Sequence, residues 1–395
     1  MGFFTKRKVA KSASGDFDVA VRQLLRKHHP DAVFVDQNDT IRYGGHAINF
    51  HNMRLQWAEH QPEDQMPWLE QIIVDFSNLN GSSSTGLNTS KVRAAVRSRA
   101  TYALQHLAME SHGAGPENIV ELLPIAGDLG WCLFVDNPMT MEALNVDRIS
   151  ASGISRGELQ KLGEANLAHE PLDGWSAMDG RVFMPVGNDY AASHIFIDGA
   201  LDALPLVGDK VVFHPFRTLA LVTSADDAEG IELAASFVLD QLQQPLPHPV
   251  SFSPVVLRSS GWKPLQLDKG HRAYTSWKTL CEVDRQMIYR DQQQLLADKL
   301  GEDIFVASYK LVAASDGDPI SIATWTKGAD SLLPITDLVA LTDLVQPLLM
   351  VRLDDVQSIC GELMEPTSHY PERLRVLDYP SSEQIEQLKQ VAVEL

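Results

Sequence analysis

The fold of this chain is decided by residues 210–242, which read KVVFHPFRTLALVTSADDAEGIELAASFVLDQL. Two apolar runs, at residues 210–213 and 218–223, have the composition of short β-strands, and Pro215 interrupts them. A helix is expected after them, with Ser224 as its cap. Its apolar side chains recur at helical spacing, at Ile231, Ala234, Ala235, Val238 and Leu242. Because no helix separates the two strands, they are expected to pair antiparallel.

The sequence around this stretch continues the pattern of short strands and helices. Ser155 and Glu158 have the spacing of a capping box, which starts a helix that is expected to end near Ala168. Another helix is expected to begin near Asp189. The apolar side chains of that helix are Ile195, Ile197 and Leu201. The strands predicted around these helices are residues 119–124, 131–135, 181–185 and 249–257.

The N-terminal part of the chain is predicted to be mainly helical. Pro67 is expected in the first turn of its helix, because proline suits that position. Residues 78–90 are uncharged and rich in small polar side chains, so they predict a flexible loop. Gly81 and Gly86 have the spacing of a phosphate-binding loop, but Leu87 stands where that motif needs lysine. The predicted elements are helices at 16–29, 51–60, 67–78 and 90–111, and a hairpin formed by 33–35 and 40–43.

The last third of the chain is predicted to be a separate, acidic unit. Residues 276–395 carry 10 Lys or Arg and 20 Asp or Glu, whereas the other 275 residues carry 23 and 32. A domain boundary is therefore expected at residues 270–276. The predicted elements of this unit are a helix at 276–300, a hairpin formed by 304–313 and 320–325, strands at 338–341, 348–353 and 374–377, and a terminal helix capped by Ser381.

Together these elements predict an α+β fold with mixed, mainly antiparallel sheets and packed helices. The length of 395 residues suggests two or three domains. The expected units are a basic disordered tail at residues 1–14, a helical and hairpin region at 15–80, a central α+β domain at 91–268 and an acidic C-terminal α+β domain at 272–395.

Composition and charge exclude several classes of partner. The chain has 33 Lys or Arg and 52 Asp or Glu, a formal net charge of -19, so no nucleic acid partner is expected. No run of about 18 apolar residues predicts a membrane span, so no membrane partner is expected either. Three cysteines lie far apart without a CxxC pair, which favours a reducing compartment and predicts a cytoplasmic protein. The only dense basic stretch is Lys6, Arg7, Lys8 and Lys11.

Three stretches carry a resemblance to a known family. They are GNDYAASH at residues 187–194, NVDRISASGISRGELQKLGEANL at 145–167, and the segment 208–241 followed by HPVSFSP at 248–254. In their order and spacing they resemble the YtpQ-like family of uncharacterised bacterial proteins, over about residues 16–265. The last third, from about Gly270, lies outside the resemblance. The family implies a cytosolic bacterial protein and supplies no established reaction.

The candidate catalytic residues are Asp189, His214 and Arg217. His214 and Arg217 lie where a strand is predicted to break, and Asp189 at a predicted helix start could orient the histidine. These residues would make a hydrolase in which Asp189 and His214 are acid–base partners. The alternative is structural: His214 bonds a nearby carbonyl, Arg217 pairs with an acid such as Asp226, and Asp189 is the cap or a first-turn acid of its helix.

The structural alternative is favoured, and it predicts a non-catalytic protein that binds a ligand or a partner. Ser193 and His194 are adjacent on a predicted helix, where neighbouring side chains diverge, so they are not a nucleophile–base pair. HExxH, HxH and CxxC are absent from the sequence, so no metal or other cofactor is expected. Cys132 is expected in the core. The partner is expected to be a protein or a small molecule, without further definition.

Overall fold

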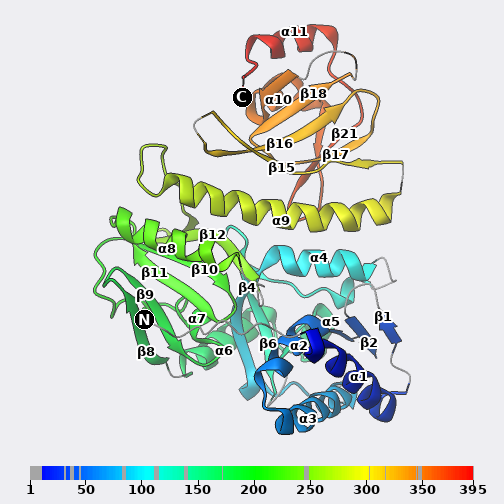
Figure 1. Ribbon diagram of the computed structural model, residues 1–395, viewed down its shortest axis with the longest axis vertical. Helices are drawn as coiled ribbons and strands as arrows, with labels where there is room; N and C mark the ends of the chain where they lie inside the picture. The colour runs from blue at the N-terminus through cyan, green and yellow to red at the C-terminus, as the bar shows by residue number, and fades with distance from the viewer. Residues whose placement is uncertain are drawn as a thin grey trace.

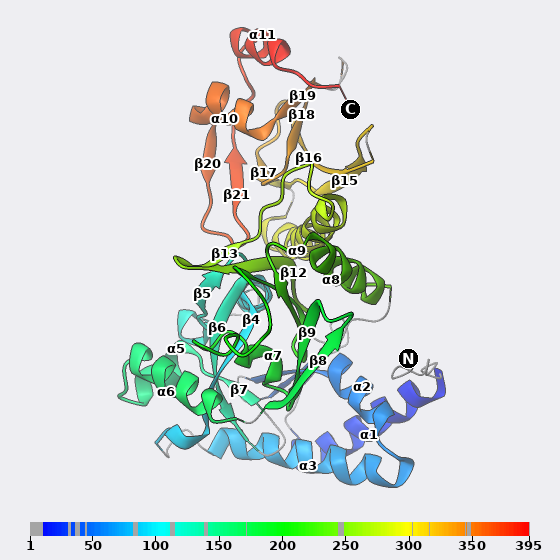
Figure 2. The same cartoon turned by 90° about the vertical axis from the view of Figure 1, so that its left-hand side faces the viewer.

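The computed structural model confirms an α+β fold in which helices pack on mainly antiparallel sheets (Figure 1). The elements follow each other along the length of the molecule, with the C-terminal part at one end and the N-terminal helices at the other (Figures 1 and 2). The structure describes residues 11–30, 33–35, 40–43, 46–81, 86–110, 115–137, 141–170, 172–243, 249–301, 303–315, 317–343, 345 and 349–394.

The N-terminal region combines three helices with a small antiparallel sheet. Its helices bury an apolar core that contains Phe17, Leu25, Trp57 and Leu69. The predicted hairpin is confirmed by the first two strands, in which Phe34 pairs with Ile41. The elements are α1 (Lys11–His28), β1 (Val33–Val35), β2 (Thr40–Tyr43), β3 (His46–Asn49), α2 (Phe50–Glu59) and α3 (Pro62–Gly81).

Two boundaries in this region differ from the sequence prediction. Helix α1 begins at Lys11, inside the segment 1–14 that was predicted as a disordered tail, and residues 1–10 lie outside the described residues. Helix α3 begins at Pro62, so Pro67 lies inside the helix and not in its first turn. The first-turn preference of proline was therefore applied to the wrong proline.

The centre of the molecule is a six-stranded antiparallel sheet in the order β13-β12-β10-β11-β9-β8. The predicted pair of strands is confirmed: Val212 of β10 lies opposite Val222 of β11. The predicted helix is also confirmed, and it covers one face of the sheet with Ile231 and Val238. The elements are β8 (Leu172–Met178), β9 (Val182–Gly187), α7 (Ala191–His194), β10 (Lys210–Phe216), β11 (Leu219–Ser224), α8 (Ala228–Gln241), β12 (Pro249–Arg258) and β13 (Gly261–Pro264).

Two helix starts in this domain are corrected by their hydrogen bonds. Asp227, not Ser224, caps α8, because its side chain accepts from the amide of Gly230 at 3.0 Å. The Ser224 hydroxyl instead donates to the carbonyl of Val207. The helix expected from Asp189 through Leu201 is only the four residues of α7, and the chain then continues in turns.

A second sheet packs beside the first, and one of its strands lies where the sequence predicts a helix. Residues 90–111 were predicted as one helix, but residues 92–98 form β4 and the helix begins only at Arg99. Alternate residues of β4 enter different apolar clusters, so burial on both faces overrides the helical preference of its alanines. The elements are η3 (Thr89–Lys91), β4 (Val92–Ser98), α4 (Arg99–Glu110), η4 (Pro116–Asn118), β5 (Leu123–Ala126), β6 (Leu129–Asp136), β7 (Met141–Ala143), α5 (Val146–Ala151) and α6 (Arg156–Ala168).

The C-terminal part carries two four-stranded sheets above the long helix α9 (Figure 1). The predicted hairpin is confirmed by β15 and β16, and the predicted capping box at the start of α6 and the cap at Ser381 are confirmed as well. The elements are α9 (Tyr274–Leu300), β14 (Phe305–Val306), β15 (Lys310–Ala313), β16 (Pro319–Thr326), β17 (Ser331–Pro334), β18 (Leu338–Thr342), β19 (Leu349–Arg352), α10 (Leu353–Cys360), η5 (Gly361–Leu363), β20 (Met364–Pro366), β21 (Arg373–Val376) and α11 (Ser382–Gln390).

Helix α9 belongs to the cores of both the central and the C-terminal parts. Trp277 and Leu280 enter the apolar cluster under the six-stranded sheet. Leu296 packs with Val306 and Leu332 of the C-terminal part. The predicted boundary at residues 270–276 therefore does not separate two independent cores, because the helix that follows it completes both of them.

Arg373 anchors the C-terminal sheets to α9 through hydrogen bonds that need no carboxylate. Its side chain is fully buried, and burial lowers its pKa to about 10. The guanidinium donates to the side chain of Gln292 at 2.6 Å and to the backbone carbonyl of Tyr289 at 3.2 Å, both on α9. It also donates to the carbonyls of Ala307 and Leu332 at 2.8 and 3.1 Å.

We expect the substitution Arg373→Lys to lower the free energy of unfolding by about 2–4 kcal/mol, because one ammonium cannot reach acceptors spread around a planar guanidinium. Urea unfolding followed by circular dichroism measures the change. Arg375→Lys is the matched control on the same strand, because Arg375 faces outward and pairs with Asp330 at 2.7 Å; we expect it to cost less than about 1 kcal/mol. Equal losses in the two variants would contradict the role given to Arg373.

Candidate functional site

His214 is a buried structural residue of β10. The residue is 1% exposed, and its Nδ1 donates to the carbonyl of Leu219 at 3.1 Å. Burial lowers the pKa of His214 to about 4, so the imidazole is neutral at physiological pH. This is the arrangement of the structural alternative, in which the histidine bonds a carbonyl where the strand bends.

Asp189 and Arg217 lie together, but their partners differ from those expected. The Asp189 carboxylate is 3.7 Å from the Arg217 guanidinium, and its side chain is 70% exposed. Arg217 also contacts the sulfur of Met141. Tyr190 occupies the cap position of α7 in place of Asp189, so the expected helix cap is wrong.

The three predicted residues do not form a joined catalytic group. Within the described part of the chain, no hydrogen bond or ion pair links His214 to Asp189 or Arg217. Arg217 pairs with Asp189 and not with Asp226, the acid that the sequence suggested. The structure therefore brings two of the three side chains together at the surface and leaves the histidine inside the domain.

The cysteines are unsuited to nucleophilic chemistry. All three are buried and unpaired, and the expectation that Cys132 lies in the core is confirmed. Burial raises the thiol pKa to about 12 for Cys132 and Cys281, and to about 11 for Cys360. A thiol with so high a pKa carries almost no thiolate at neutral pH.

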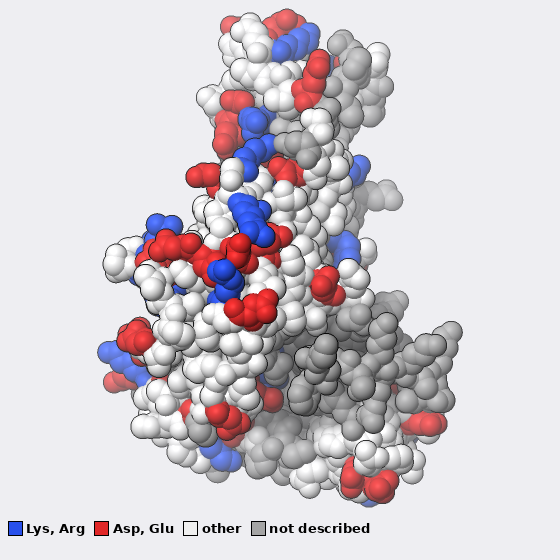
Figure 3. Space-filling view, turned by 60° about the vertical axis from the view of Figure 1, so that its left-hand side comes forward, with Lys and Arg blue, Asp and Glu red and all other residues white. Residues whose placement is uncertain are grey.

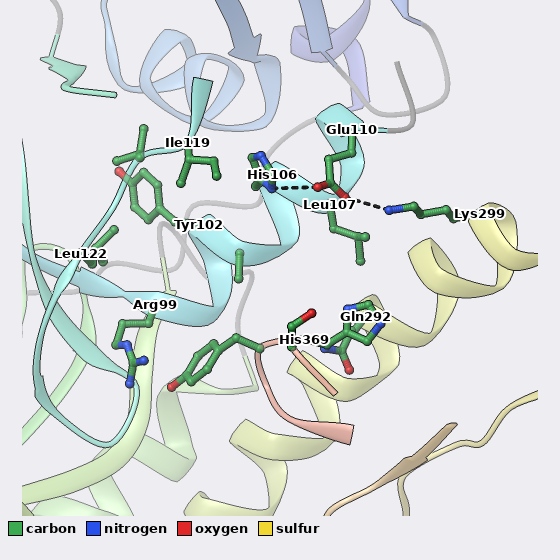
Figure 4. Close-up of a pocket in the computed structure, with 14 residues that line it drawn as sticks. Arg99, Tyr102, His106, Leu107, Glu110, Ile119, Leu122, Gln292, Lys299 and His369 are labelled. Carbon is green, nitrogen blue, oxygen red and sulfur yellow. Dashed lines mark hydrogen bonds and ion pairs between the residues drawn. The ribbon is translucent and has the colours of Figure 1, made fainter. Parts of the chain in front are cut away.

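A cavity between α4 and α9 brings together polar side chains that the sequence analysis did not single out. Its volume is about 420 Å³, and segments of the central and C-terminal parts form its walls (Figure 4). Helix α4 supplies one wall, because its side chains at intervals of three and four residues share one face. The lining residues are Arg99, Tyr102, Ala103, His106, Leu107, Glu110, Ile119, Val120, Leu122, Gln292, Lys299, Ser368, His369 and Tyr370.

One end of the cavity is formed by Arg99 and Tyr370. The guanidinium of Arg99 stacks on the ring of Tyr370, 4.3 Å from its centre, and donates to the carbonyl of Gly127 at 3.3 Å. No carboxylate among the described residues forms an ion pair with Arg99. Arg99 is therefore a cation at a cavity wall that is held by a ring and a carbonyl and forms no ion pair with an acid of the described residues.

The other end holds Glu110, which is the only acid among the described residues that line the cavity. Glu110 bonds the ammonium of Lys299 at 2.8 Å and lies 3.6 Å from Nδ1 of His106 (Figure 4). The hydrogen bond from Lys299 lowers the pKa of Glu110, so this carboxylate is ionised. The described lining carries two cations, Arg99 and Lys299, and one carboxylate, so it has an excess of positive charge.

His369 lies on the α9 side of the cavity, beside Gln292 (Figure 4). Burial lowers its pKa, and the nearby charges of Arg373 and Lys299 lower it further, whereas Glu110 acts in the opposite direction. The ring is therefore neutral at pH 7. A negative charge placed in the cavity would favour its protonated form.

Asp128 lies directly behind Arg99 and starts helix α4. Its carboxylate accepts from the amide of Ala100 at 2.8 Å, and its carbonyl accepts from the amide of Arg99. Burial, followed by the charge of Asp284, raises the pKa of Asp128 to about 7. This acid is therefore half-ionised near neutral pH at the point where the C-terminal part meets α4.

Comparison with known proteins adds no assignment. No family model, curated protein or solved structure matches this chain. The resemblance to the YtpQ-like family therefore stays a prediction. In the residues that the structure describes, no three metal-ligating side chains gather into a possible metal site, and none of the helices is long and apolar enough to cross a membrane.

His214→Asn tests the structural role of the buried histidine. The pKa of about 4 in the folded state lies below the unfolded value of about 6.5. The wild-type protein should therefore lose about 2–3 kcal/mol of stability as the pH falls from 6.5 to 4. The amide of Asn keeps a donor for Leu219 without titrating, so the variant should show a flatter pH dependence in urea unfolding. The exposed His169→Asn should keep the wild-type slope, and equal slopes in all three proteins would contradict the assignment.

Asp128→Asn should change stability in the opposite pH range. The pKa of about 7 lies above the unfolded value of about 3.9, so the stability present at low pH is lost as the pH rises through 7. The amide oxygen of Asn can still accept from Ala100. We therefore expect similar melting temperatures near pH 3.5, and an advantage for the variant that grows as the pH rises to 8. A variant that melts lower at pH 8 would show that ionised Asp128 stabilises the fold.

Proposed function

We propose that this chain is a non-catalytic binding protein that holds a small anionic ligand, a carboxylate or a phosphate, in the cavity between α4 and α9. The observation that carries the proposal is Arg99, which faces a cavity of about 420 Å³ without an ion-pair partner among the described residues. A guanidinium offers five donors in a planar fork that matches carboxylate and phosphate oxygens.

Further donors around the cavity support an anionic ligand. Ser368 contributes a hydroxyl, whereas the Tyr102 phenol is buried against Cys132 and the Gln292 amide is bonded to Pro371 and Arg373. Lys299 adds a cation that Glu110 only partly neutralises, since Glu110 also lies close to His106. The walls of this cavity are more polar than apolar, which suits a charged ligand better than an apolar one.

Binding is favoured over hydrolysis by the surroundings of the candidate catalytic residues. An acid–base pair must reach the reacting atoms, and His214 is buried with its Nδ1 bonded to Leu219. Asp189 is at the surface beside Arg217. The hydrolase alternative needs Asp189 and His214 next to each other and in reach of a substrate, and the two side chains do not lie in that arrangement.

The proposal keeps the expectation of a cytoplasmic bacterial protein that binds neither nucleic acid nor membrane. On the face drawn in Figure 3, basic and acidic side chains of the described residues alternate, and no continuous basic surface is visible there. Such mixed charge does not neutralise a row of phosphates. The anion is therefore expected to be a small molecule and not a polymer.

Titration with inorganic phosphate and with acetate, followed by calorimetry, tests the proposal. We expect Arg99→Gln to weaken binding of the preferred anion by about tenfold or more, because one charge-assisted pair is lost. Arg290→Gln is the matched control, because Arg290 is an exposed arginine of α9 outside the cavity. Affinity for acetate, whose charge does not change in this range, should rise as the pH falls from 8 to 6, because neutral Asp128 and protonated His369 would both favour the anion.

Two outcomes would contradict this function. The first is that neither anion binds the wild-type protein at millimolar concentration. The second is that Arg99→Gln and Arg290→Gln weaken binding equally, which would show that the anion responds to general surface charge and not to this cavity. His369→Asn adds a further check, because it should reduce the rise in affinity at low pH while leaving binding at pH 8 nearly unchanged.

A further inference from the structure

A second hollow, separate from the cavity between α4 and α9, is lined by aromatic rings. Its volume is about 520 Å³, and it shares no lining residue with the first cavity. It lies between the edge strands β5 and β13 and helix α6. The lining residues are Pro124, Ile125, Trp131, Lys161, Glu164, Ala165, Ala168, Phe196, Ile197, Asp198 and Trp262.

Three rings from distant parts of the sequence make the apolar wall of this aromatic hollow. Phe196 is the centre of the group: its ring is 4.8 Å from Trp262 in a tilted arrangement and 6.4 Å from Trp131 in an edge-on arrangement. Phe196 is buried, whereas both tryptophans are only partly buried. The two indoles therefore flank a fixed ring and keep surface available to a ligand.

Local backbone features place the tryptophans at the hollow. Gly130 precedes Trp131, and a Cβ at that glycine would lie 3.0–3.1 Å from side-chain atoms of Arg99 and Leu122 and from a backbone oxygen of β5. The absence of a side chain thus lets β5 lie close to β6. Gly261, with φ of +94°, ends the tight turn between β12 and β13 and directly precedes Trp262.

The polar rim of the hollow is acidic on balance. Glu164 on α6 and Asp198 after α7 both line it, and neither forms an ion pair with a cation of the described residues. Glu164 accepts one hydrogen bond, from Gln160 at 2.7 Å. Lys161 is the single cation among the described residues of the rim, and its charge is shared with Glu158, whose pKa it helps to lower.

We propose that the aromatic hollow binds an organic cation, namely a quaternary or methylated ammonium group. The faces of tryptophan and phenylalanine carry negative electrostatic potential and attract such a cation, most strongly at tryptophan. A methylated ammonium also suits apolar walls, because it donates few or no hydrogen bonds. Glu164 and Asp198 supply the counter-charge at the rim, which an anionic or neutral ligand would not use.

This site differs from the proposed anion site in every element of recognition. The cavity between α4 and α9 presents Arg99 and Lys299, whereas the hollow presents three rings and two carboxylates with one lysine. Its ligand is therefore of the opposite charge. The inference stands or falls independently of the anion site.

The test compares choline with 3,3-dimethylbutan-1-ol, which has the same shape without the charge. Binding is followed by the indole N–H signals of protein labelled with ¹⁵N at tryptophan. We expect choline to bind at least about fivefold more tightly than the alcohol, which is the size of a partly desolvated cation–π contact. The signals of Trp131 and Trp262 should shift, and that of the distant Trp68 should not.

Variants locate the site. Trp262→Leu should weaken choline binding at least about fivefold, whereas Trp68→Leu should leave it unchanged. Glu164→Gln and Asp198→Asn should each weaken it about two- to threefold, and Asp202→Asn, an exposed acid outside the hollow, should not. Glu164→Gln and Asp198→Asn, compared with Asp202→Asn, still locate the site if Trp262→Leu does not fold.

Three results would overturn the proposal. Equal binding of choline and the alcohol would show an apolar pocket that does not recognise charge. No shift with choline at any concentration up to about 50 mM would show that the hollow binds no such cation, because even a weak site has a Kd of a few millimolar. Choline binding that survives both acid substitutions and Trp262→Leu would place the cation elsewhere.

Discussion

The buried polar side chains of α9 are the constraint on which the rest of the structure depends. Glu282 and Gln292 are nearly or fully buried in this helix, and each must be bonded because unpaired buried polar groups are costly. Glu282 is bonded by Lys278 at 2.8 Å and by the hydroxyl of Tyr309, and Gln292 by Arg373. These bonds fix the C-terminal sheets on the helix in one register, which apolar contacts alone specify less strictly.

The cavity between α4 and α9 follows from that fixed register. Gln292 donates to the carbonyl of Pro371 at 2.7 Å, and Arg373 is anchored two residues further along. The segment just before them carries Tyr370, so the anchored backbone sets this ring over Arg99. At the other end, Lys299 bonds Glu110 and joins the last turns of α9 and α4. A gap bounded by fixed contacts at both ends keeps its shape, as a binding site requires.

The sequence predicts the elements whose signals lie within a short stretch of residues. It does not predict elements whose secondary structure depends on burial against distant parts of the chain. Strands β10 and β11 and helix α8 were found because their patterns and the intervening breaks lie within 33 residues. Strand β4 was missed, because its alanines favour a helix when considered alone and only contact on both faces makes them a strand. The cavity could not be predicted at all: Tyr370 and Gly127 are 243 positions apart, and Lys299 and Glu110 are 189 apart. The helical spacing of Arg99, Tyr102, His106 and Glu110 was the one available signal, and it was hidden inside a helix predicted to start too early.

Net charge is a poor guide to what such a chain binds, because recognition depends on the balance at each site. The formal net charge of -19 argues against the binding of long polyanions. Arg99 is nevertheless a cation without an ion-pair partner among the described residues. The hairpin of β5 and β6 lies between two sites of opposite character. Its turn at Gly127 and Asp128 supports Arg99 and the start of α4, whereas its strands carry Ile125 and Trp131 into the aromatic hollow. One rigid hairpin can therefore serve a cationic cavity and an acidic aromatic hollow, because the sheet determines the position of its backbone and the neighbouring helices determine the charge on each side.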